Sequence, residues 1–430
     1  MFSIFAILLS GCLLAIFNNT FIYEIIVYFS ILSVSTCYLI DISKSKRFKL
    51  YIKPLFFAVL FRLVILYVFR YIYLNNIMSI PVISQELFSD PLSFYTNAVG
   101  YVNGNSNFTG GFFVTFLGSI YKVVGCSRLL GEFLVSFFSV LSINITILIN
   151  EELEINYSSS KKCIWLLSVL PYTLLYSTML RRESIIILCV SISLLFYIKW
   201  VDNKGIINFV KCLLFSVFAS LFHGGTGIIA VGYIMTMILY NPSSQKIKLK
   251  ITNIFGSLLF FGVFLFLFNN YKDVLFTKLD NISDISTIAK TSSLGGSSYA
   301  QYVGDSRTPL RFTVFLVPRY IYFMFSPFPW QWRGMGDIIS FISSSVLYLT
   351  IIILSVKYIF RNKLEGGNRT LLILLSLIAL VTAITFSWGV SNTGTAIRHR
   401  DKFIVLYITM LAIIDNYKIK AKNKYEKEVN

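Results

Sequence analysis

The sequence predicts an all-α, polytopic integral membrane protein with about 12 transmembrane helices, on the basis of its hydropathy, its charge-free windows and the positions of its lysines. Of 430 residues, 56% are hydrophobic and only 13% are charged, and the mean hydropathy is +0.72. Windows such as residues 163–180 and 371–397 contain no charged residue. At about 1.5 Å per residue they can cross about 30 Å of hydrocarbon, and because lipid offers no hydrogen bonds their backbone must be helical.

The net charge of +18 does not indicate nucleic-acid binding, because the lysines lie in short segments between hydrophobic runs and no recognition motif accompanies them. The six cysteines fall mostly inside hydrophobic segments and form no CxxC pair, so neither a disulfide framework nor a metal site is predicted. The sequence also lacks a GxxxxGK[ST] loop and a GxGxxG motif after a strand. We therefore expect no cofactor, no metal and no nucleic-acid partner.

Lysine-rich segments mark the cytoplasmic side by the positive-inside rule, and they fix the count of spans. Residues 1–17 have neither a basic start nor a small-residue cleavage site, so they are expected to remain as the first span. Starting inside, the predicted spans are residues 1–17, 21–40, 54–78, 128–149, 162–180, 184–200, 206–222, 225–240, 251–268, 338–356, 371–387 and 403–414. Both termini then lie in the cytoplasm, residues 1–430 form a single membrane domain, and residues 416–430 form a basic cytoplasmic tail.

Two long segments, residues 79–127 and 269–337, are expected to be extracytoplasmic loops with interfacial or re-entrant helices. Residues 111–124 are apolar, but one more crossing there would place the lysines of segment 246–250 outside, so we expect a re-entrant or interfacial segment. Residues 91–102 carry apolar side chains at helical spacing beside polar ones, which is typical of a helix on the membrane surface. Residues 309–325 are interpreted likewise, because Arg311 and Arg319 interrupt the apolar run.

Arginines gather on the face opposite to the lysines, against the bias that keeps basic residues out of translocated loops. A guanidinium group binds phosphate in a bidentate way, whereas lysine acts as a point charge, so the choice of arginine indicates phosphate recognition. The candidate phosphate-binding residues are Arg181, Arg182, Arg307, Arg311, Arg319, Arg333, Arg398 and Arg400.

Each of these positions also has a purely structural interpretation. The polar run at residues 391–402, which contains His399, could hold a phosphate or could form a solvated loop between two helices. Arg181 and Arg182 stand beside Glu183 in a very short connection between apolar helices, where they could equally be a snorkelling pair that caps helix ends. His223, next to two glycines, could contact a sugar or could lie at the interface without contacting any substrate.

Asp90 in the first outer loop could accept a proton from an attacking sugar hydroxyl, and His399 is a second candidate for this catalytic role. The structural alternative for Asp90 is an N-cap, because aspartate before a proline, here Pro91, is a common helix start. Trp330 and Trp332 could stack on sugar rings or line the entry of a lipid tail, but they also suit the aromatic belt of a membrane interface.

Arg62 and Arg70 lie within the third predicted span. They should point into the bundle or toward the outer interface, with partners such as Glu132 and not lipid.

From residue 89 to residue 184, the order of features resembles membrane glycosyltransferases of the GT-C class. An outer loop with the acid Asp90 is followed by a surface helix, an aromatic segment, a span, and a helix with Leu170, Pro171 and Ser177 that ends in Arg-Glu. In that class the acid of the first loop is the base and the donor is a polyprenyl-phosphate sugar. The resemblance implies the same role for Asp90.

As a whole, the chain is similar to the Wzy-type polymerases of O-antigen and capsular polysaccharide, which are multi-pass proteins of the bacterial inner membrane with arginine-rich outer loops. The resemblance implies that the eight arginines bind the pyrophosphates of undecaprenyl-linked donor and acceptor. It also implies membrane lipid, a chain-length regulator and a flippase as partners. The Arg-x10-Gly pattern of some polymerases is absent, because Ile192 stands eleven residues after Arg181.

Three functions therefore remain open on the sequence. The first is polymerisation of undecaprenyl-pyrophosphate-linked oligosaccharide repeats on the extracytoplasmic face, as in O-antigen or lipopolysaccharide biosynthesis. The second is transfer of single sugars by a GT-C enzyme with Asp90 as base, and the third is flipping or export of lipid-linked sugars. Transport should place charges along a path through the bundle, which Arg62, Arg70 and Glu132 favour and the nearly charge-free central spans do not.

Overall fold

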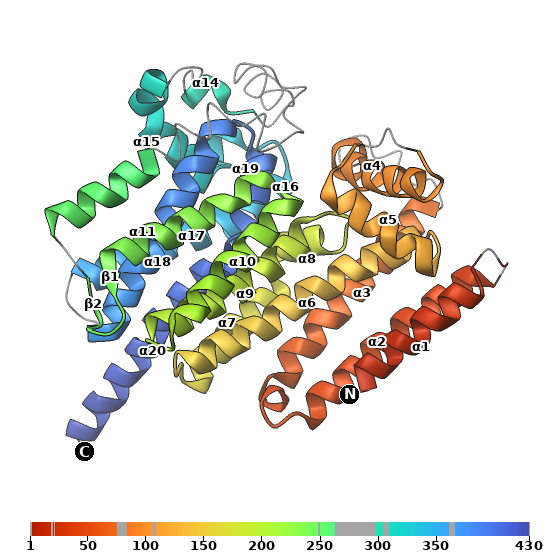
Figure 1. The fold of residues 1–430 in the computed structure, drawn as a ribbon, viewed down its shortest axis with the longest axis horizontal. Helices are drawn as coiled ribbons and strands as arrows, with labels where there is room; N and C mark the ends of the chain where they lie inside the picture. Colours follow the sequence, from red (N-terminus) through yellow and green to blue (C-terminus); the bar gives the residue numbers. More distant parts are fainter. Residues whose placement is uncertain are drawn as a thin grey trace. The chain divides into compact units, whose positions relative to one another are not determined.

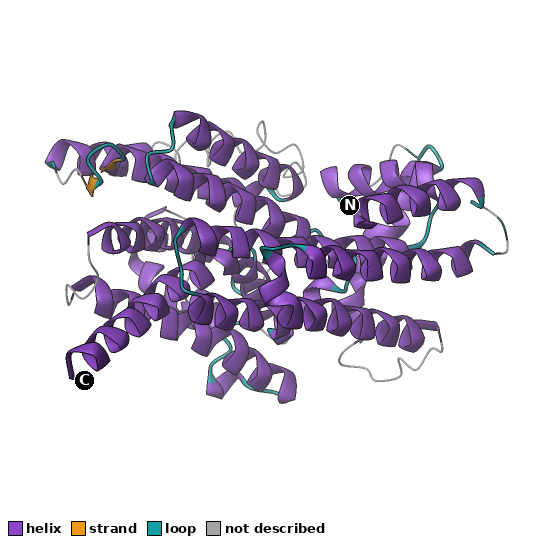
Figure 2. Cartoon of the chain, turned by 90° about the horizontal axis from the view of Figure 1, so that it is seen from below, coloured by secondary structure: helices purple, strands orange, loops and turns teal. Residues whose placement is uncertain are grey.

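The computed structural model describes residues 2–18, 20, 22–74, 84–105, 109–247, 250–262, 298–303, 309–360 and 366–429. Apart from one antiparallel pair of two-residue strands, β1 (Tyr240–Asn241) and β2 (Lys246–Ile247), the regular structure of these residues is helical (Figure 2). The all-α prediction is confirmed for this part of the chain. Its contacts form two compact units: unit 1 is residues 1–147 with 164–188, and unit 2 is residues 148–163 with 189–430.

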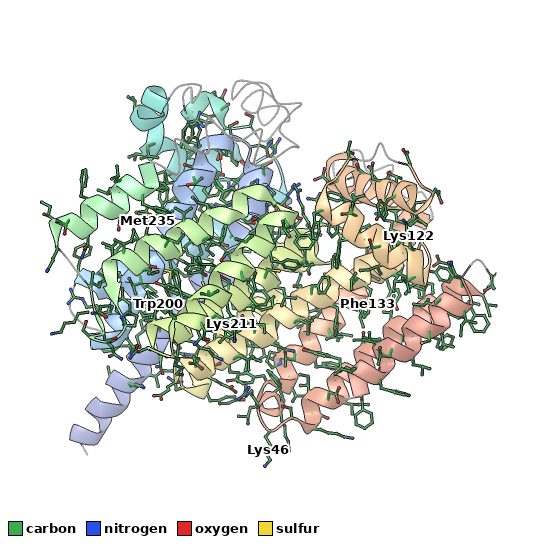
Figure 3. All side chains as sticks on the ribbon, viewed as in Figure 1. Lys46, Lys122, Phe133, Trp200, Lys211 and Met235 are labelled. Atoms are coloured by element: carbon green, nitrogen blue, oxygen red, sulfur yellow. The ribbon has the colours of Figure 1, made fainter. Side chains whose placement is uncertain are left out.

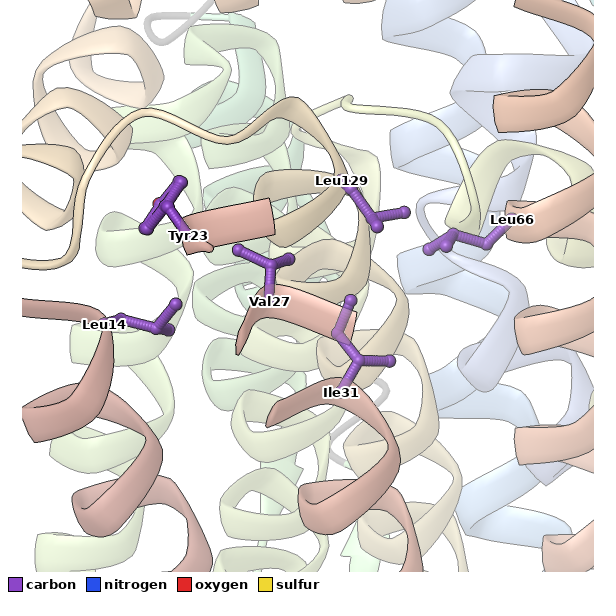
Figure 4. Packing of buried hydrophobic residues seen from close by; sticks show 6 residues of the cluster. All are labelled: Leu14, Tyr23, Val27, Ile31, Leu66 and Leu129. Carbon is purple, nitrogen blue, oxygen red and sulfur yellow. The ribbon is translucent and has the colours of Figure 1, made fainter. Parts of the chain in front are cut away.

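Unit 1 begins with a helical hairpin of α1 and α2 (Figure 1). Its hydrophobic core combines residues of α1, α2, α3 and α6, namely Leu14, Tyr23, Val27, Ile31, Leu66 and Leu129 (Figure 4). The remaining large side chains of α1, such as Phe5 and Leu8, are exposed, as expected of a surface that meets lipid. The helices that contribute to unit 1 are α1 (Phe2–Ile16), α2 (Tyr23–Lys44), η1 (Phe48–Tyr51), α3 (Ile52–Leu74), α4 (Ser84–Val102), α5 (Phe112–Val124), most of α6 (Arg128–Glu152), the end of α7 (Tyr157–Val169), α8 (Pro171–Ser177) and the start of α9 (Glu183–Val201).

Helix α5 corresponds to the segment that the sequence predicts to be re-entrant or interfacial. Its 13 residues extend about 20 Å, which is less than the roughly 30 Å of a hydrocarbon core. The helix ends at Gly125, whose φ of 86° lies in the region that favours glycine. There the Tyr23 hydroxyl donates a hydrogen bond of 2.9 Å to the Val124 carbonyl and so ties the end of α5 to α2.

Helix α4 differs from the sequence prediction at its start. The pair Asp90-Pro91 predicts a helix that begins there, but α4 begins at Ser84 and Pro91 lies inside it. Proline removes its own N–H from the ladder and crowds the carbonyl four residues earlier, but the other hydrogen bonds of the preceding turn can still form. Asp90 is therefore not the N-cap of this helix.

The predicted span at residues 162–180 is interrupted. The structure has α7 (Tyr157–Val169) and α8 (Pro171–Ser177), separated at Leu170, whose backbone is extended with φ −60° and ψ 117°. The helical region is disfavoured for the residue before a proline, and Pro171 occupies the first position of α8, where no N–H is needed. After this break, the short α8 leads into the connection that contains Arg181.

Unit 2 is also built from helices. Polar pairs join them inside an apolar surrounding: the hydroxyls of Ser193 and Ser216 lie 2.8 Å apart, and Tyr197 donates to Thr236 at 2.8 Å, contacts that help helices associate in lipid. Its elements include part of α7, most of α9 (Glu183–Val201), α10 (Ile206–Phe222), η2 (Gly224–Gly227), α11 (Ile228–Leu239), α14 (Ala300–Val303), α15 (Pro309–Phe325), η3 (Pro329–Gln331), α16 (Met335–Ser340), the π-helical turn η4 (Phe341–Val346), α17 (Leu347–Phe360), α18 (Gly366–Gly389), α19 (Thr393–Asp401) and α20 (Ile404–Val429).

Six helices in the described residues are long and apolar enough to cross a membrane, which supports a multi-pass membrane protein. They are Tyr23–Lys44, Phe48–Val68, Arg128–Glu152, Glu183–Val201, Met335–Phe360 and Gly367–Gly389. Further apolar helices, including α1, α5, α10 and Ile251–Gly262, are shorter. The six long helices coincide with six of the predicted spans, and the count of about 12 stays a prediction.

Candidate functional site

Several of the sequence-predicted site residues form two groups, one within each unit. In unit 1, Asp90 of α4 and Arg181 of the connection between α8 and α9 form an ion pair, with 3.8 Å between Oδ2 and Nη1. The side chain of Arg181 is 4% exposed, whereas that of Asp90 is 45% exposed. The pair therefore presents an accessible carboxylate held against a buried guanidinium. We call Asp90, Arg181, Arg182 and Glu183 the Asp90 cluster.

Aromatic rings flank both arginines of this cluster. The guanidinium carbon of Arg181 lies 5.4 Å from the centre of the Tyr176 ring, and that of Arg182 lies 5.9 Å from the centre of the Phe94 ring. Such contacts stabilise a cation and fix its plane. Tyr176 belongs to α8 and Phe94 to α4, so both helices that approach the cluster contribute to its geometry.

Glu183 is the first residue of α9 and is buried. A carboxylate is favourable at this end of a helix because the peptide dipoles place partial positive charge there. Arg181 and Glu183 are buried, and Arg182 is partly exposed.

The connection that carries Arg181 is fixed against α6 by two close contacts. The Ser136 hydroxyl of α6 donates a hydrogen bond of 2.8 Å to the Ser177 carbonyl at the end of α8. At Gly131 of α6, a Cβ atom would meet the Tyr121 hydroxyl and would lie 2.9 Å from Cδ1 of Leu180. Glycine is thus needed there for the close approach of α5, α6 and the residue next to Arg181.

In unit 2, the two histidines of the chain lie together. His223 precedes η2 and His399 belongs to α19, and their ring centres are 5.0 Å apart. The Phe386 ring of α18 lies 4.7 Å from His399 and 6.0 Å from His223. Nζ of the fully buried Lys402 is 3.0 Å from Nδ1 of His399. We call His223, Phe386, His399 and Lys402 the His399 cluster.

The polar run at residues 391–402 folds as a helix and not as a solvated loop. The Asn392 side chain accepts hydrogen bonds from the backbone N–H groups of Gly394 and Thr395 and so caps α19. Tyr299 binds the two residues that precede Asn392. Its backbone N–H donates to the Ser391 carbonyl, and its hydroxyl donates to the Val390 carbonyl. The C-terminal end of α19, with its histidine and charged side chains, is therefore mostly buried.

Two of the candidate arginines in unit 2 bind backbone carbonyls. Arg400 donates to the carbonyl of Met324 and, at 2.8 Å, to that of Ser326, at the C-terminal end of α15. Arg319 donates to the carbonyl of Trp388 at 3.3 Å. Cations are favourable at a helix C-terminus, where carbonyls remain unsatisfied. These contacts give Arg400 a structural explanation that needs no phosphate.

The other predicted residues are more exposed or lie outside the described part. Arg333 is half exposed and pairs with Asp337 at 3.7 Å. Trp330 is exposed and stacks on Phe328 with ring centres 4.7 Å apart, and Trp332 is also exposed. Arg398 is partly buried on α19. Arg307 and the side chains of Arg311 and Arg70 lie outside the described residues.

Arg62 of α3 is buried in unit 1 and donates to the Ser139 hydroxyl at 2.9 Å and to the Ala58 carbonyl at 3.0 Å. Glu132, its expected partner, accepts a hydrogen bond of 2.8 Å from Arg128. This buried pair ties the first turn of α6 together.

Sequence reasoning missed Lys402, Phe386 and Tyr176. Only Lys402 left a signal, because it stands one helical turn after His399 in the same polar run. Among the described residues, no group of three or more histidine, cysteine, aspartate or glutamate side chains could hold a metal ion.

No known protein family matches the chain, and neither a curated protein nor a solved structure shows significant similarity to it.

Proposed function

We propose that the protein is a membrane glycosyltransferase that polymerises lipid-linked oligosaccharide repeats, with undecaprenyl pyrophosphate as the carrier of the donor. The observation that carries the proposal is the ion pair of Asp90 and Arg181, at 3.8 Å, in which an accessible carboxylate lies beside a buried guanidinium. Glycosyl transfer from a lipid diphosphate needs both groups, a proton acceptor for the nucleophile and a fixed cation for the leaving group.

The reaction assigns one task to each member of the pair. An acceptor hydroxyl attacks the anomeric carbon, and its proton passes to the Asp90 carboxylate. The bond between the anomeric carbon and the pyrophosphate oxygen breaks, and the pyrophosphate leaves with the electron pair. Arg181, with Arg182 beside it, stabilises the negative charge that develops on that oxygen, and it does so without reorganisation because its side chain is buried.

In this proposal the two long segments, residues 79–127 and 269–337, face the outside of a bacterial inner membrane, and both termini face the cytoplasm. The arginines that stay candidates for phosphate are then Arg181, Arg182, Arg307, Arg311, Arg333 and Arg398. Arg319 and Arg400 support the backbone.

A second candidate is a GT-C transferase that adds one sugar from a polyprenyl phosphate, because the same pair of Asp90 and Arg181 favours it. Purified protein in lipid nanodiscs, supplied with an undecaprenyl-pyrophosphate-linked repeat, distinguishes the two. A ladder of products that differ by one repeat supports polymerisation. Addition of a single sugar from a polyprenyl-phosphate donor supports the transferase, and the absence of any new glycosidic bond with either donor rejects both.

A further inference from the structure

The chain has only two histidines, far apart in the sequence, and the fold brings their rings to 5.0 Å from each other. They come from the turn before η2 and from α19, and the Phe386 ring contacts both. The two rings do not meet on the protein surface, because His399 is buried and His223 is partly buried.

Lys402 decides which nitrogen of His399 carries hydrogen. Nζ of Lys402 is 3.0 Å from Nδ1 of His399, and an ammonium group has three donors and no acceptor. With Lys402 as an ammonium group, Nδ1 accepts and the hydrogen of the neutral ring resides on Nε2. Nζ also lies 5.8 Å from the centre of the Phe386 ring, over its face, a contact that favours the ammonium form.

We propose that Lys402 is a positioning residue that makes His399 a hydrogen-bond donor to an anionic oxygen of the substrate, and not the base of the reaction. The role of His399 as a hydrogen-bond donor to the substrate rests on the proposed function, in which the substrate carries a pyrophosphate. His399 has its Nδ1 lone pair bound by Lys402 and hydrogen on Nε2, so it has no nitrogen with which to accept a proton.

The charged neighbours of the His399 cluster are consistent with a hydrogen bond from His399 to an anionic oxygen. Arg398, Arg400 and Asp401 share α19 with His399, and Arg319 comes from α15. Arg400 and Arg319 donate to the backbone carbonyls described above. Three arginines and one aspartate leave a net positive charge among these neighbours, which suits an oxygen of a phosphate group.

The test is ¹⁵N NMR of the full-length protein in lipid nanodiscs, labelled only at histidine, at neutral pH. Two histidines give four ring nitrogens, and His223→Gln assigns them. We expect Nδ1 of His399 without hydrogen and Nε2 with hydrogen. Hydrogen on Nδ1 of His399 in the unmodified protein would overturn the inference.

Two further measurements sharpen the test. In Lys402→Met the preference of His399 for this tautomer should be lost, whereas Lys211→Met should leave the spectrum unchanged, because Lys211 lies on α10 with an exposed side chain near Phe196 (Figure 3). Undecaprenyl pyrophosphate should shift the Nε2 signal of His399. An unchanged tautomer in Lys402→Met, or an Nε2 signal that ignores the lipid, contradicts the inference.

The outcome is separable from the proposed function. A protein with the expected tautomer and lipid shift that forms no glycosidic bond would reject the glycosyltransferase and leave the role of Lys402 intact. A protein that polymerises but carries hydrogen on Nδ1 of His399 would support the glycosyltransferase and reject the role of Lys402.

Discussion

Arg181 and Arg400 are both buried arginines next to apolar helices, and the sequence gives them the same role. The structure separates them by their partners. Arg181 faces the exposed carboxylate of Asp90, whereas Arg400 donates to the carbonyls at the end of α15. No local sequence pattern distinguishes the two, because their partners lie far away in the chain. The same is true of His223 and His399. The sequence marks each as a candidate, but no local pattern predicts that their rings lie together.

Arg181→Ala should abolish product formation, and Arg181→Lys should restore only part of it, since lysine supplies the charge without the planar fork. The measurement is the rate of ladder formation per folded protein, with the amount of folded protein determined by size-exclusion chromatography in detergent. Equal rates for Arg181→Ala and the unmodified protein would remove Arg181 from the site.

Arg400→Met should act on stability. Hydrogen bonds to charged groups contribute roughly 1.5–3 kcal/mol each, so loss of the two that reach α15 should lower the free energy of unfolding by about 3 kcal/mol or more. Thermal unfolding in detergent measures the change. A variant with unchanged stability and a much weaker affinity for undecaprenyl pyrophosphate would instead assign Arg400 to the substrate.

At the scale of elements, two proline positions mark the difference between prediction and structure. The sequence predicts a helix that begins at Pro91, but this residue lies inside α4, and Pro171 divides a predicted single span into α7 and α8. Proline lacks a backbone N–H and restricts the conformation of the residue before it. The packing around the helix decides whether the turn before the proline still forms. The position of a proline in the sequence therefore does not tell which outcome applies.

Gly131→Ala tests how tightly α5, α6 and the Arg181 connection are packed. The added Cβ meets Tyr121 and Leu180, and overpacking typically costs about 1–3 kcal/mol, so both stability and activity should fall. Gly11→Ala in α1 is the matched control, because its Cβ would have no atom within 4 Å. Thermal unfolding of both variants measures the difference, and equal stabilities would contradict the close approach at Gly131.

At the scale of the whole molecule, composition alone predicts the all-α membrane protein correctly, since apolar windows long enough to span a bilayer have few other structures available. The number of crossings is a harder problem. Helices α1, α5 and α10 are apolar but short, so their length alone does not decide whether they cross. Charge bias provides the orientation, and it acts during insertion and not through contacts in the folded chain.

The predicted orientation can be tested with single cysteines in a cysteine-free background. Lys46→Cys, in the connection between α2 and η1 (Figure 3), should be protected in intact cells from a thiol reagent that does not cross membranes. Arg333→Cys, which is exposed, should react. Labelling of the first residue and not of the second would reverse the orientation and place the arginines in the cytoplasm.

The most direct test of the central claim is the rate of glycosidic-bond formation by Asp90→Asn in nanodiscs supplied with a lipid-linked repeat. Asparagine keeps the size of the side chain but cannot take the proton, so the rate should fall by roughly 10²–10⁴-fold, as expected for loss of a general base. Lys211→Met, prepared in parallel, should retain the rate of the unmodified protein. Folded Asp90→Asn protein that extends the glycan within a few-fold of that rate would contradict the account.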